Sequence, residues 1–245
     1  MATNRRIVLA SRPAGAVATD NFRLETVPLP ALQDGQLLVR NRWLSLDPYM
    51  RGRMNEGRSY AAAQALGETM VGGTAGEVVE SRHPKFAIGD QVVGYLGWQE
   101  YGISDGSQLM KVDTAHIPLS AYLGAVGMPG VTAWYGLNRI IEPKAGETVV
   151  VSAASGAVGG VVGQLARLSS CQAVGIAGGE EKCRYAVDEL GFDACIDYKR
   201  EDVGKALKAA APDGVDGYFE NVGGEIMDAV LPRMNGATLI AELQK

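Results

Sequence analysis

A glycine-rich turn has the clearest chemical capacity in this sequence. Residues 149–167 read VVVSAASGAVGGVVGQLAR, an apolar strand that runs directly into glycines and then into a helical pattern. Such a turn brings backbone close to a pyrophosphate, and the helix N-terminus favours negative charge. We expect Gly156 and Gly159 to make this close approach, with Gly160 and Gly163 allowing tight helix–sheet packing. The spacing is AxxGxxG rather than GxGxxG, so a tight turn without a ligand is the alternative.

The residues after the next strand indicate which nucleotide the turn would hold. NAD-specific sites place an acid at the end of that strand, where it binds the ribose hydroxyls. Here the strand ends in Ala177-Gly178-Gly179, and the cations Lys182 and Arg184 follow shortly after. Small residues leave room for a 2′-phosphate, and a nearby cation neutralises it. The sequence therefore favours NADPH over NADH, with a solvated helix charge as the alternative for Lys182.

The second half of the chain alternates strands and helices around this turn. Strands are expected at 148–154, 172–178, 193–198, 215–222 and 237–243, with helices to about residue 169, at 180–190 and near 201–211. This alternation implies right-handed crossovers and a parallel sheet.

The first half reads as short strands separated by turns. Residues 36–44, 71–80 and 91–96 are strand-like, and frequent turn signals between them suggest a small barrel. Gly72, Gly73 and Gly76 share one strand pattern, which often marks a bulge or a close backbone approach. We expect a domain boundary near residue 120, followed by helices over 120–142 that Gly127-Met128-Pro129-Gly130 interrupts.

Composition and charge exclude several classes of protein. The 245 residues are 47% hydrophobic and 21% charged, which is a globular composition. Residues 1–120 hold 12 basic and 12 acidic side chains, and residues 121–245 hold 11 and 16. Neither half has an excess of basic residues, so we expect no nucleic-acid partner. No apolar run is long enough to span a bilayer, and we expect no membrane partner.

The cysteines and histidines favour neither a disulfide framework nor zinc. Cys171, Cys183 and Cys195 are odd in number and form no CxxC pair, and His83 and His116 lie far from them in sequence. The N-terminus MATNRRIVLASRP has only a four-residue apolar run, shorter than a secretory signal requires. We therefore expect a cytoplasmic protein without a metal.

A series of motifs resembles a known family. They are NRRIVLASRP (4–13), LSLDPYMRGRM (44–54), MVGGTAGEVVES (70–81), GMPGVTAWYGL (127–137), AASGAVGGVVGQLA (153–166), GGEEKCR (178–184), LGFDACIDY (190–198) and ENVGGE (220–225). In this order they resemble the zinc-independent medium-chain dehydrogenase/reductases, on the branch of the NADPH-dependent curcumin and leukotriene/prostaglandin reductases.

The resemblance implies an α/β fold of two domains. They are a GroES-like β-barrel substrate domain over 1–120 and an incomplete Rossmann-type NADPH-binding domain over 121–245, with the active site in the cleft between them. The implied reaction is NADPH-dependent reduction of the C=C bond of α,β-unsaturated ketones and aldehydes, by hydride transfer to the β-carbon. The negative charge that develops on the carbonyl oxygen then needs a hydrogen-bond donor.

Individual positions match the family's functional residues. The resemblance assigns cofactor binding to Thr132, Gly156, Ala157, Val158, Gly159, Lys182, Tyr198 and Asn221. It assigns substrate contacts to Tyr49, Tyr60 and Met128, with domain packing as the alternative for the tyrosines and a core position for Met128. It also allows a homodimer.

The sequence departs from the family at its end. Family members continue for about 90–100 residues and carry, after the fifth Rossmann strand, a segment whose tyrosine is the proposed enolate donor. The sequence stops at Lys245, so we expect a truncated product or fragment that lacks the last strand and helices, and leave the catalytic residue unassigned. The alternatives are a zinc-free quinone oxidoreductase and a non-catalytic NADPH-binding fragment.

Overall fold

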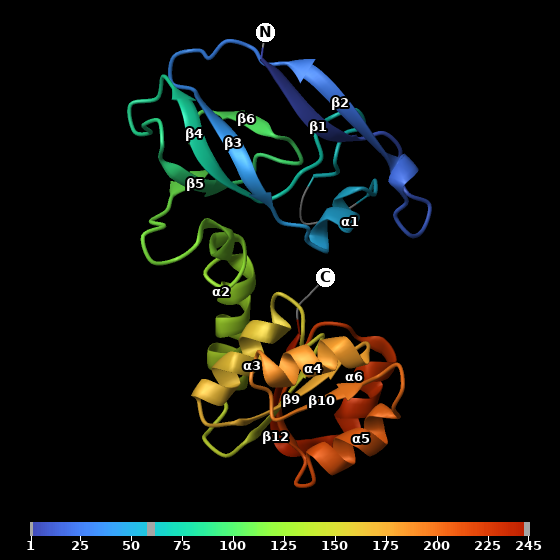
Figure 1. The fold of residues 1–245 in the computed structure, drawn as a ribbon. Helices are drawn as coiled ribbons and strands as arrows, with labels where there is room; N and C mark the ends of the chain where they lie inside the picture. Colours follow the sequence, from blue (N-terminus) through green and yellow to red (C-terminus); the bar gives the residue numbers. More distant parts are fainter. Residues whose placement is uncertain (1, 58–61, 243–245) are drawn as a thin grey trace. The chain divides into compact units, whose positions relative to one another are not determined.

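The chain divides into two compact units. The computed structural model describes residues 2–57 and 62–242, and the units are Met1–Leu123 and Gly124–Gln244 (Figure 1). The change in sequence character predicts a boundary after residue 120; the compact units divide between Leu123 and Gly124.

The first unit is built from antiparallel strands. A two-stranded ribbon pairs β1 (Thr3–Leu9) with β2 (Phe22–Pro28). A five-stranded sheet has the order β6-β3-β4-β5-β7, and its hydrogen-bonded ladders stay open between the outer strands in the part of the chain described. Its strands are β3 (Leu37–Leu44), β4 (Thr74–Ser81), β5 (Gln91–Gly94), β6 (Tyr101–Ser104) and β7 (Leu109–Lys111).

The expected strand over 71–80 begins at Thr74, so Gly72 and Gly73 precede β4 and only Gly76 lies on it. Two of the three glycines make the close approach that their clustering predicts. An added Cβ at Gly76 would overlap the carbonyl oxygen of Arg40 on β3, and one at Gly72 would lie 2.9 Å from the Trp98 ring. The ladder between β3 and β4 shifts register beside Gly76, between Asn41 and Trp43. Gly73 differs, because its nearest neighbour would be at an ordinary contact distance.

Two small apolar clusters stabilise this unit. Leu37, Val39 and Val78 alternate along β3 and β4 and meet Val92 in one cluster. The other cluster joins Leu9 to three methionines, Met50, Met54 and Met70, around the short helix α1 (Tyr49–Arg53).

The second unit is a parallel sheet covered on both faces. Its strand order is β10-β9-β8-β11-β12, with β8 (Thr148–Ser152), β9 (Gln172–Ala177), β10 (Ala194–Asp197), β11 (Val215–Glu220) and β12 (Met234–Glu242). Its helices are α2 (Met128–Tyr135), a π-helical segment (Gly136–Ile141), α3 (Gly159–Leu168), α4 (Glu180–Asp188), α5 (Val203–Ala210) and α6 (Gly224–Val230). Within residues 2–57 and 62–242 there are also three short 3₁₀ turns, at Thr19–Asn21, Leu119–Leu123 and Leu231–Arg233.

Alternate residues of β8 bury against opposite helix layers. Val149 and Val151 pack in the cluster that α2, α3 and α4 cover, whereas Val150 packs in the cluster that α5 and α6 cover (Figure 1). A strand buried on both faces reads as a continuous apolar run, which is why VVV marks the centre of the sheet.

The sequence before α2 ends one helix and starts another. The 3₁₀ turn stops at Leu123 and α2 begins at Met128, with Pro129 in its first turn, where a missing N–H breaks no helical hydrogen bond. Gly130 has no room for a side chain, because a Cβ there would overlap the carbonyl oxygen of Ala125. The predicted interruption at 127–130 is therefore where α2 starts.

Candidate functional site

The β8–α3 turn is shaped by close contacts within its own backbone. The expected strand over 148–154 ends at Ser152, because Ala153 adopts a left-handed conformation with φ 49°. The Ala153 carbonyl accepts a hydrogen bond from Gly156 N–H at 2.8 Å. An added Cβ at Gly159 would overlap that same carbonyl oxygen. Gly159 is therefore required by the turn itself, independently of any ligand.

The turn presents free hydrogen-bond donors beside a helix N-terminus. Among the described residues, the backbone N–H groups of Ala157 and Val158 meet no acceptor. They immediately precede α3, whose dipole favours negative charge at this end. This arrangement can bind a phosphate group.

Two further glycines let α3 lie close to the sheet, as the sequence predicts. An added Cβ at Gly160 would lie 3.0 Å from Leu190, and one at Gly163 would overlap the buried ring of Phe192.

The loop after β9 leads directly into α4. Gly179 has φ 113° and caps α4, and Lys182 lies exposed in the helix's first turn. The loop after β10 lies beside it, because an added Cβ at Gly178 would be 2.7 Å from the Tyr198 hydroxyl. Tyr198 is 43% exposed, which leaves part of its ring accessible to a ligand.

A buried carboxylate organises the loop after β11. Glu220 accepts hydrogen bonds from the Tyr218 hydroxyl, from Ser152 Oγ at 3.0 Å, and from the backbone N–H groups of Val222 and Gly223. Burial alone raises the pKa of Glu220, but these hydrogen bonds outweigh it and hold the pKa below its ordinary value. Burial and the same carboxylate raise the pKa of Tyr218.

Asn221 is held in place by β8. Its side-chain amide donates to the Ser152 carbonyl at 2.8 Å, and its backbone N–H donates to Ser152 Oγ at 2.7 Å. The sequence-predicted residues Gly156–Gly159, Lys182, Tyr198 and Asn221 thus all follow the carboxyl ends of neighbouring parallel strands. Ligands of open α/β sheets bind at this edge.

The residues expected near the substrate, and Thr132, which was expected near the nicotinamide, come from different elements. Met128 and Thr132 share α2, where the Thr132 hydroxyl donates to the Met128 carbonyl at 2.8 Å and Met128 is 50% exposed. Tyr49 lies on α1 in the first unit and packs against the methionine cluster. Tyr60 lies outside the described residues.

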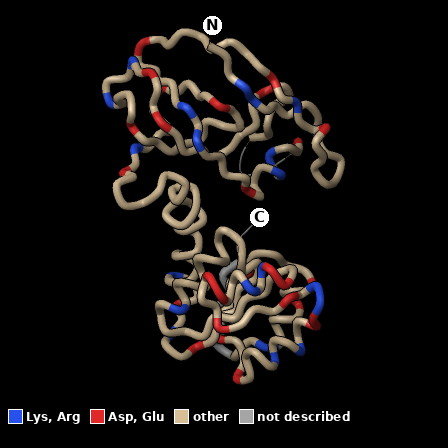
Figure 2. The backbone as a smooth tube through the Cα atoms, viewed as in Figure 1, with Lys and Arg blue, Asp and Glu red and all other residues tan. Residues whose placement is uncertain are grey.

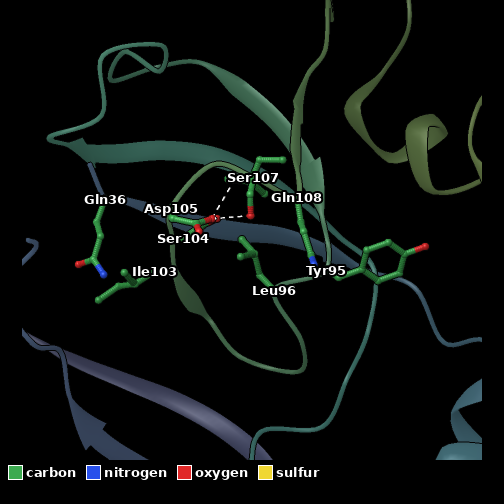
Figure 3. Close-up of a pocket in the computed structure, with 9 residues that line it drawn as sticks. Gln36, Tyr95, Leu96, Ile103, Ser104, Asp105, Ser107 and Gln108 are labelled. Carbon is green, nitrogen blue, oxygen red and sulfur yellow. Dashed lines mark hydrogen bonds between the residues drawn. The ribbon is translucent and has the colours of Figure 1, made fainter. Parts of the chain in front are cut away.

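A cavity of about 430 Å³ lies in the first unit (Figure 3). It is lined mainly by polar side chains, including Gln36, Asp105 and Gln108, with Tyr95 at one side. The Asp105 carboxylate is engaged by a neighbour in sequence, because it accepts hydrogen bonds from the backbone N–H and the hydroxyl of Ser107. Among the described residues, none of those predicted for the site lines this cavity.

Charged side chains of both signs are mixed along the described residues (Figure 2). Lys/Arg and Asp/Glu alternate along both units without one long basic tract (Figure 2). Within residues 2–57 and 62–242, no three His, Cys, Asp or Glu side chains gather as a metal site. No described helix is long and apolar enough to cross a membrane.

Sequence reasoning left Glu220, Tyr218, Ser152 and Asp197 without roles. Each is a buried polar or hydroxyl-bearing residue at or near the carboxyl end of a strand. The available signal was an acid ending an otherwise apolar strand, as in VDGYFE and DACID.

Two protein-family models match this chain. A model described as the N-terminal domain of oxidoreductase matches residues 5–112, and one described as zinc-binding dehydrogenase matches 157–235. The chain is 52% identical to NADPH-dependent curcumin reductase of Escherichia coli (strain K12), over 97% of this chain and 69% of that protein. It is 45% identical to prostaglandin reductase 1 of Oryctolagus cuniculus, over 90% of this chain and 62% of that protein.

A solved structure agrees with these matches. CurA from Vibrio vulnificus, in complex with NADPH, superposes with a TM-score of 0.90 at 49% identity, over 96% of this chain and 69% of that one. The fold and site thus define a two-unit α/β oxidoreductase. The chain belongs to the medium-chain dehydrogenase/reductase family, on the branch that contains the curcumin and prostaglandin reductases.

The match to a zinc-binding dehydrogenase model raises the question of a metal. His83 lies in the first unit, whereas Cys171, Cys183 and Cys195 lie in the second as free thiols. The described residues do not gather into a zinc ligand set.

Proposed function

We propose that the second unit binds NADPH and that the enzyme reduces the C=C bond of α,β-unsaturated ketones and aldehydes. The observation that carries the proposal is the β8–α3 turn, with its free Ala157 and Val158 N–H groups at a helix N-terminus. NADPH dependence of the curcumin reductase relative and the NADPH complex of the CurA structure support it.

Each cofactor segment has a role that its chemistry suits. The Gly156–Gly159 turn would hold the pyrophosphate, and Lys182 would neutralise the 2′-phosphate. Tyr198 and Asn221 would contact the nucleotide from the neighbouring loops, and Thr132 would lie near the nicotinamide. The strand β9 ends at Ala177 and Gly178 follows it, without an acid, which leaves room for the 2′-phosphate.

The proposed substrates are small α,β-unsaturated carbonyl compounds. NADPH supplies the hydride that goes to the β-carbon. Tyr49, Tyr60 and Met128 are the proposed substrate contacts. The names of relatives at 52% and 44% identity, a curcumin reductase and a 2-alkenal reductase of Nicotiana tabacum, support this substrate class. A group that stabilises the enolate oxygen is required, and no residue is assigned to it.

The proposal extends to three general properties. The three cysteines are free, which suits a reducing cytoplasmic compartment. Zinc-independent chemistry and a homodimer follow the family resemblance. Metal analysis and the mass of the protein in solution would test the last two.

One titration and one assay test the function. NADPH and NADH are titrated into the protein, and loss of NADPH absorbance is then followed with a 2-alkenal, with its saturated aldehyde and with a quinone. We expect tighter binding of NADPH and oxidation only with the 2-alkenal. Equal use of the saturated aldehyde would contradict C=C reduction, and turnover with the quinone alone would favour a quinone oxidoreductase. Binding without turnover would leave an NADPH-binding fragment.

A further inference from the structure

Two neighbouring loops of the second unit are joined by one buried side chain. The loop after β9 carries Gly178 and Gly179, and the loop after β10 carries Tyr198 and Lys199. Asp197, the last residue of β10, is 6% exposed. Its Oδ1 accepts hydrogen bonds from Gly179 N–H at 2.8 Å and from Lys199 N–H at 3.1 Å.

The other carboxylate oxygen does not contribute to this link. Asp197 Oδ2 is buried and meets no hydrogen-bond partner among the described residues. The carboxylate therefore joins the two loops only through the hydrogen bonds that Oδ1 accepts from Gly179 N–H and Lys199 N–H. Both would survive replacement of the carboxylate by an amide, because an amide oxygen can accept the same two bonds.

A second contact between the loops is weaker. Arg200 pairs with Glu180 at 2.7 Å, but the two side chains are 68% and 72% exposed. Exposed ion pairs contribute little because water screens them and the side chains lose freedom. Asp197 is therefore the stronger of these two side-chain links; one backbone hydrogen bond, from Tyr198 N–H to the Ala177 carbonyl at 3.1 Å, also joins the loop after β10 to the end of β9.

The link fixes the relative positions of groups that face the proposed 2′-phosphate. Gly179 adopts φ 113° and begins the helix that carries Lys182. On the other side, an added Cβ at Gly178 would lie 2.7 Å from the Tyr198 hydroxyl, so the two loops are close at this point. A change in the separation of the two loops would move Lys182 away from Tyr198.

We infer that Asp197 is a positioning residue for nucleotide selection: its hydrogen bonds to Gly179 and Lys199 set the loop geometry that prefers a 2′-phosphate. This inference rests on the proposed NADPH site. It assigns the effect to hydrogen-bond geometry, because the negative charge of Asp197 itself disfavours a phosphate.

The test compares 2′,5′-ADP with 5′-AMP, which differ only in the 2′-phosphate. Their dissociation constants are measured by calorimetry for the original protein, Asp197→Asn and Asp197→Ala. We expect the preference for 2′,5′-ADP to fall at least about tenfold in Asp197→Ala. The free energy of a hydrogen bond to a carboxylate corresponds to more than a tenfold change in a dissociation constant. We expect Asp197→Asn to keep the preference within about twofold, since it retains both bonds.

Asp193 provides a matched control at the opposite end of β10. Its carboxylate accepts a hydrogen bond from Ala173 N–H at 2.8 Å and pairs with Arg167 at 2.9 Å. Asp193→Ala removes a comparable anchor from the same strand without touching the two loops. We expect it to lower the thermal midpoint but to leave the ratio of dissociation constants unchanged.

The outcomes separate this inference from the proposed function. If the original protein prefers 2′,5′-ADP and Asp197→Ala keeps that preference, the inference is wrong and the NADPH site stands. If Asp197→Asn loses as much preference as Asp197→Ala, the two retained hydrogen bonds do not set the preference, which also overturns it. If the original protein shows no preference, both fail. If Asp197→Ala does not fold, Asp197→Ser replaces it, because its hydroxyl can still accept a hydrogen bond. We expect Asp197→Ser to lose part of the preference for 2′,5′-ADP.

Discussion

The Ser152 hydroxyl lies 3.0 Å from Oε1 of Glu220, where β8 and β11 end side by side. Ser152 is fully buried and Glu220 is 2% exposed. β8 and β11 are neighbours in the sheet although two strands separate them in the sequence, so their ends mark the reversal of strand order. Doubly wound sheets bind ligands at this point. The hydrogen bond thus ties the turn that carries Asn221 to the glycine-rich turn.

Neutralising the buried carboxylate is expected to destabilise the second unit strongly. Glu220→Gln removes the negative charge, so the hydrogen bonds from Ser152, Tyr218 and the two backbone N–H groups are no longer charge-assisted. We expect the free energy of unfolding in urea to fall by about 3 kcal/mol. Ser152→Ala, which removes one neutral donor from the same network, should lower it by about 1 kcal/mol. A larger loss in Ser152→Ala than in Glu220→Gln would contradict this account.

The same carboxylate is expected to make stability depend on pH. The pKa of Glu220 in the folded state lies below the ordinary value of 4.5. Its contribution is therefore complete above pH 4.5, where the group is ionised in both states. It is lost as pH falls through the folded-state pKa, because the unfolded chain takes up the proton first. The stability difference between the original protein and Glu220→Gln should be constant near neutral pH and shrink in acid. A difference that grows in acid would show the opposite sign of pKa shift.

Gly163 is expected to tolerate no side chain. An added Cβ would overlap the ring of Phe192, which is 3% exposed and enclosed by the core. Overpacking of this kind costs about 1–3 kcal/mol, so Gly163→Ala should lower the free energy of unfolding by about 2 kcal/mol.

Gly204 on α5 is the control for the same substitution. Its nearest atom would be the Asp202 carboxylate at 3.5 Å, an ordinary contact distance. Gly204→Ala should raise the free energy of unfolding by about 0.5 kcal/mol, through helix propensity alone. Equal effects of the two alanines would rule out the steric account of Gly163.

The arrangement of the second unit was predictable because strand and helix periods alternate clearly. The order of apolar strands, the glycine-rich turn and the packing roles of Gly160 and Gly163 all follow from local patterns. The exact end of β8 does not follow from a local pattern, because alanine as a residue type gives no sign of the left-handed conformation that Ala153 adopts. The helix α6 was not predicted, because its seven residues follow Gly223, begin with Gly224 and present no clear period.

Contacts between residues that lie far apart in the chain could not be predicted from the sequence. β1 pairs with β2 across a loop that shows no hairpin signal. Glu220 and Ser152 are 68 residues apart, and Asp197 and Gly179 are 18 apart. A buried acid at a strand end is visible in the sequence, but its donors are known only once the strands are adjacent.

Lys182 is expected to discriminate between the two nicotinamide nucleotides. It lies exposed in the first turn of α4, and its charge would be directed at the 2′-phosphate that NADPH has and NADH lacks. Lys182→Ala should weaken NADPH binding about tenfold and leave NADH binding unchanged, because a single charge-assisted contact is removed. The comparison is made by fluorescence titration at low salt, where exposed charges are least screened. Lys208→Ala, which removes the same charge from the exposed side of α5, controls for the net charge of the unit. If both alanines weaken NADPH binding equally, the effect is one of overall charge, and Lys182 has no special part in selecting the nucleotide.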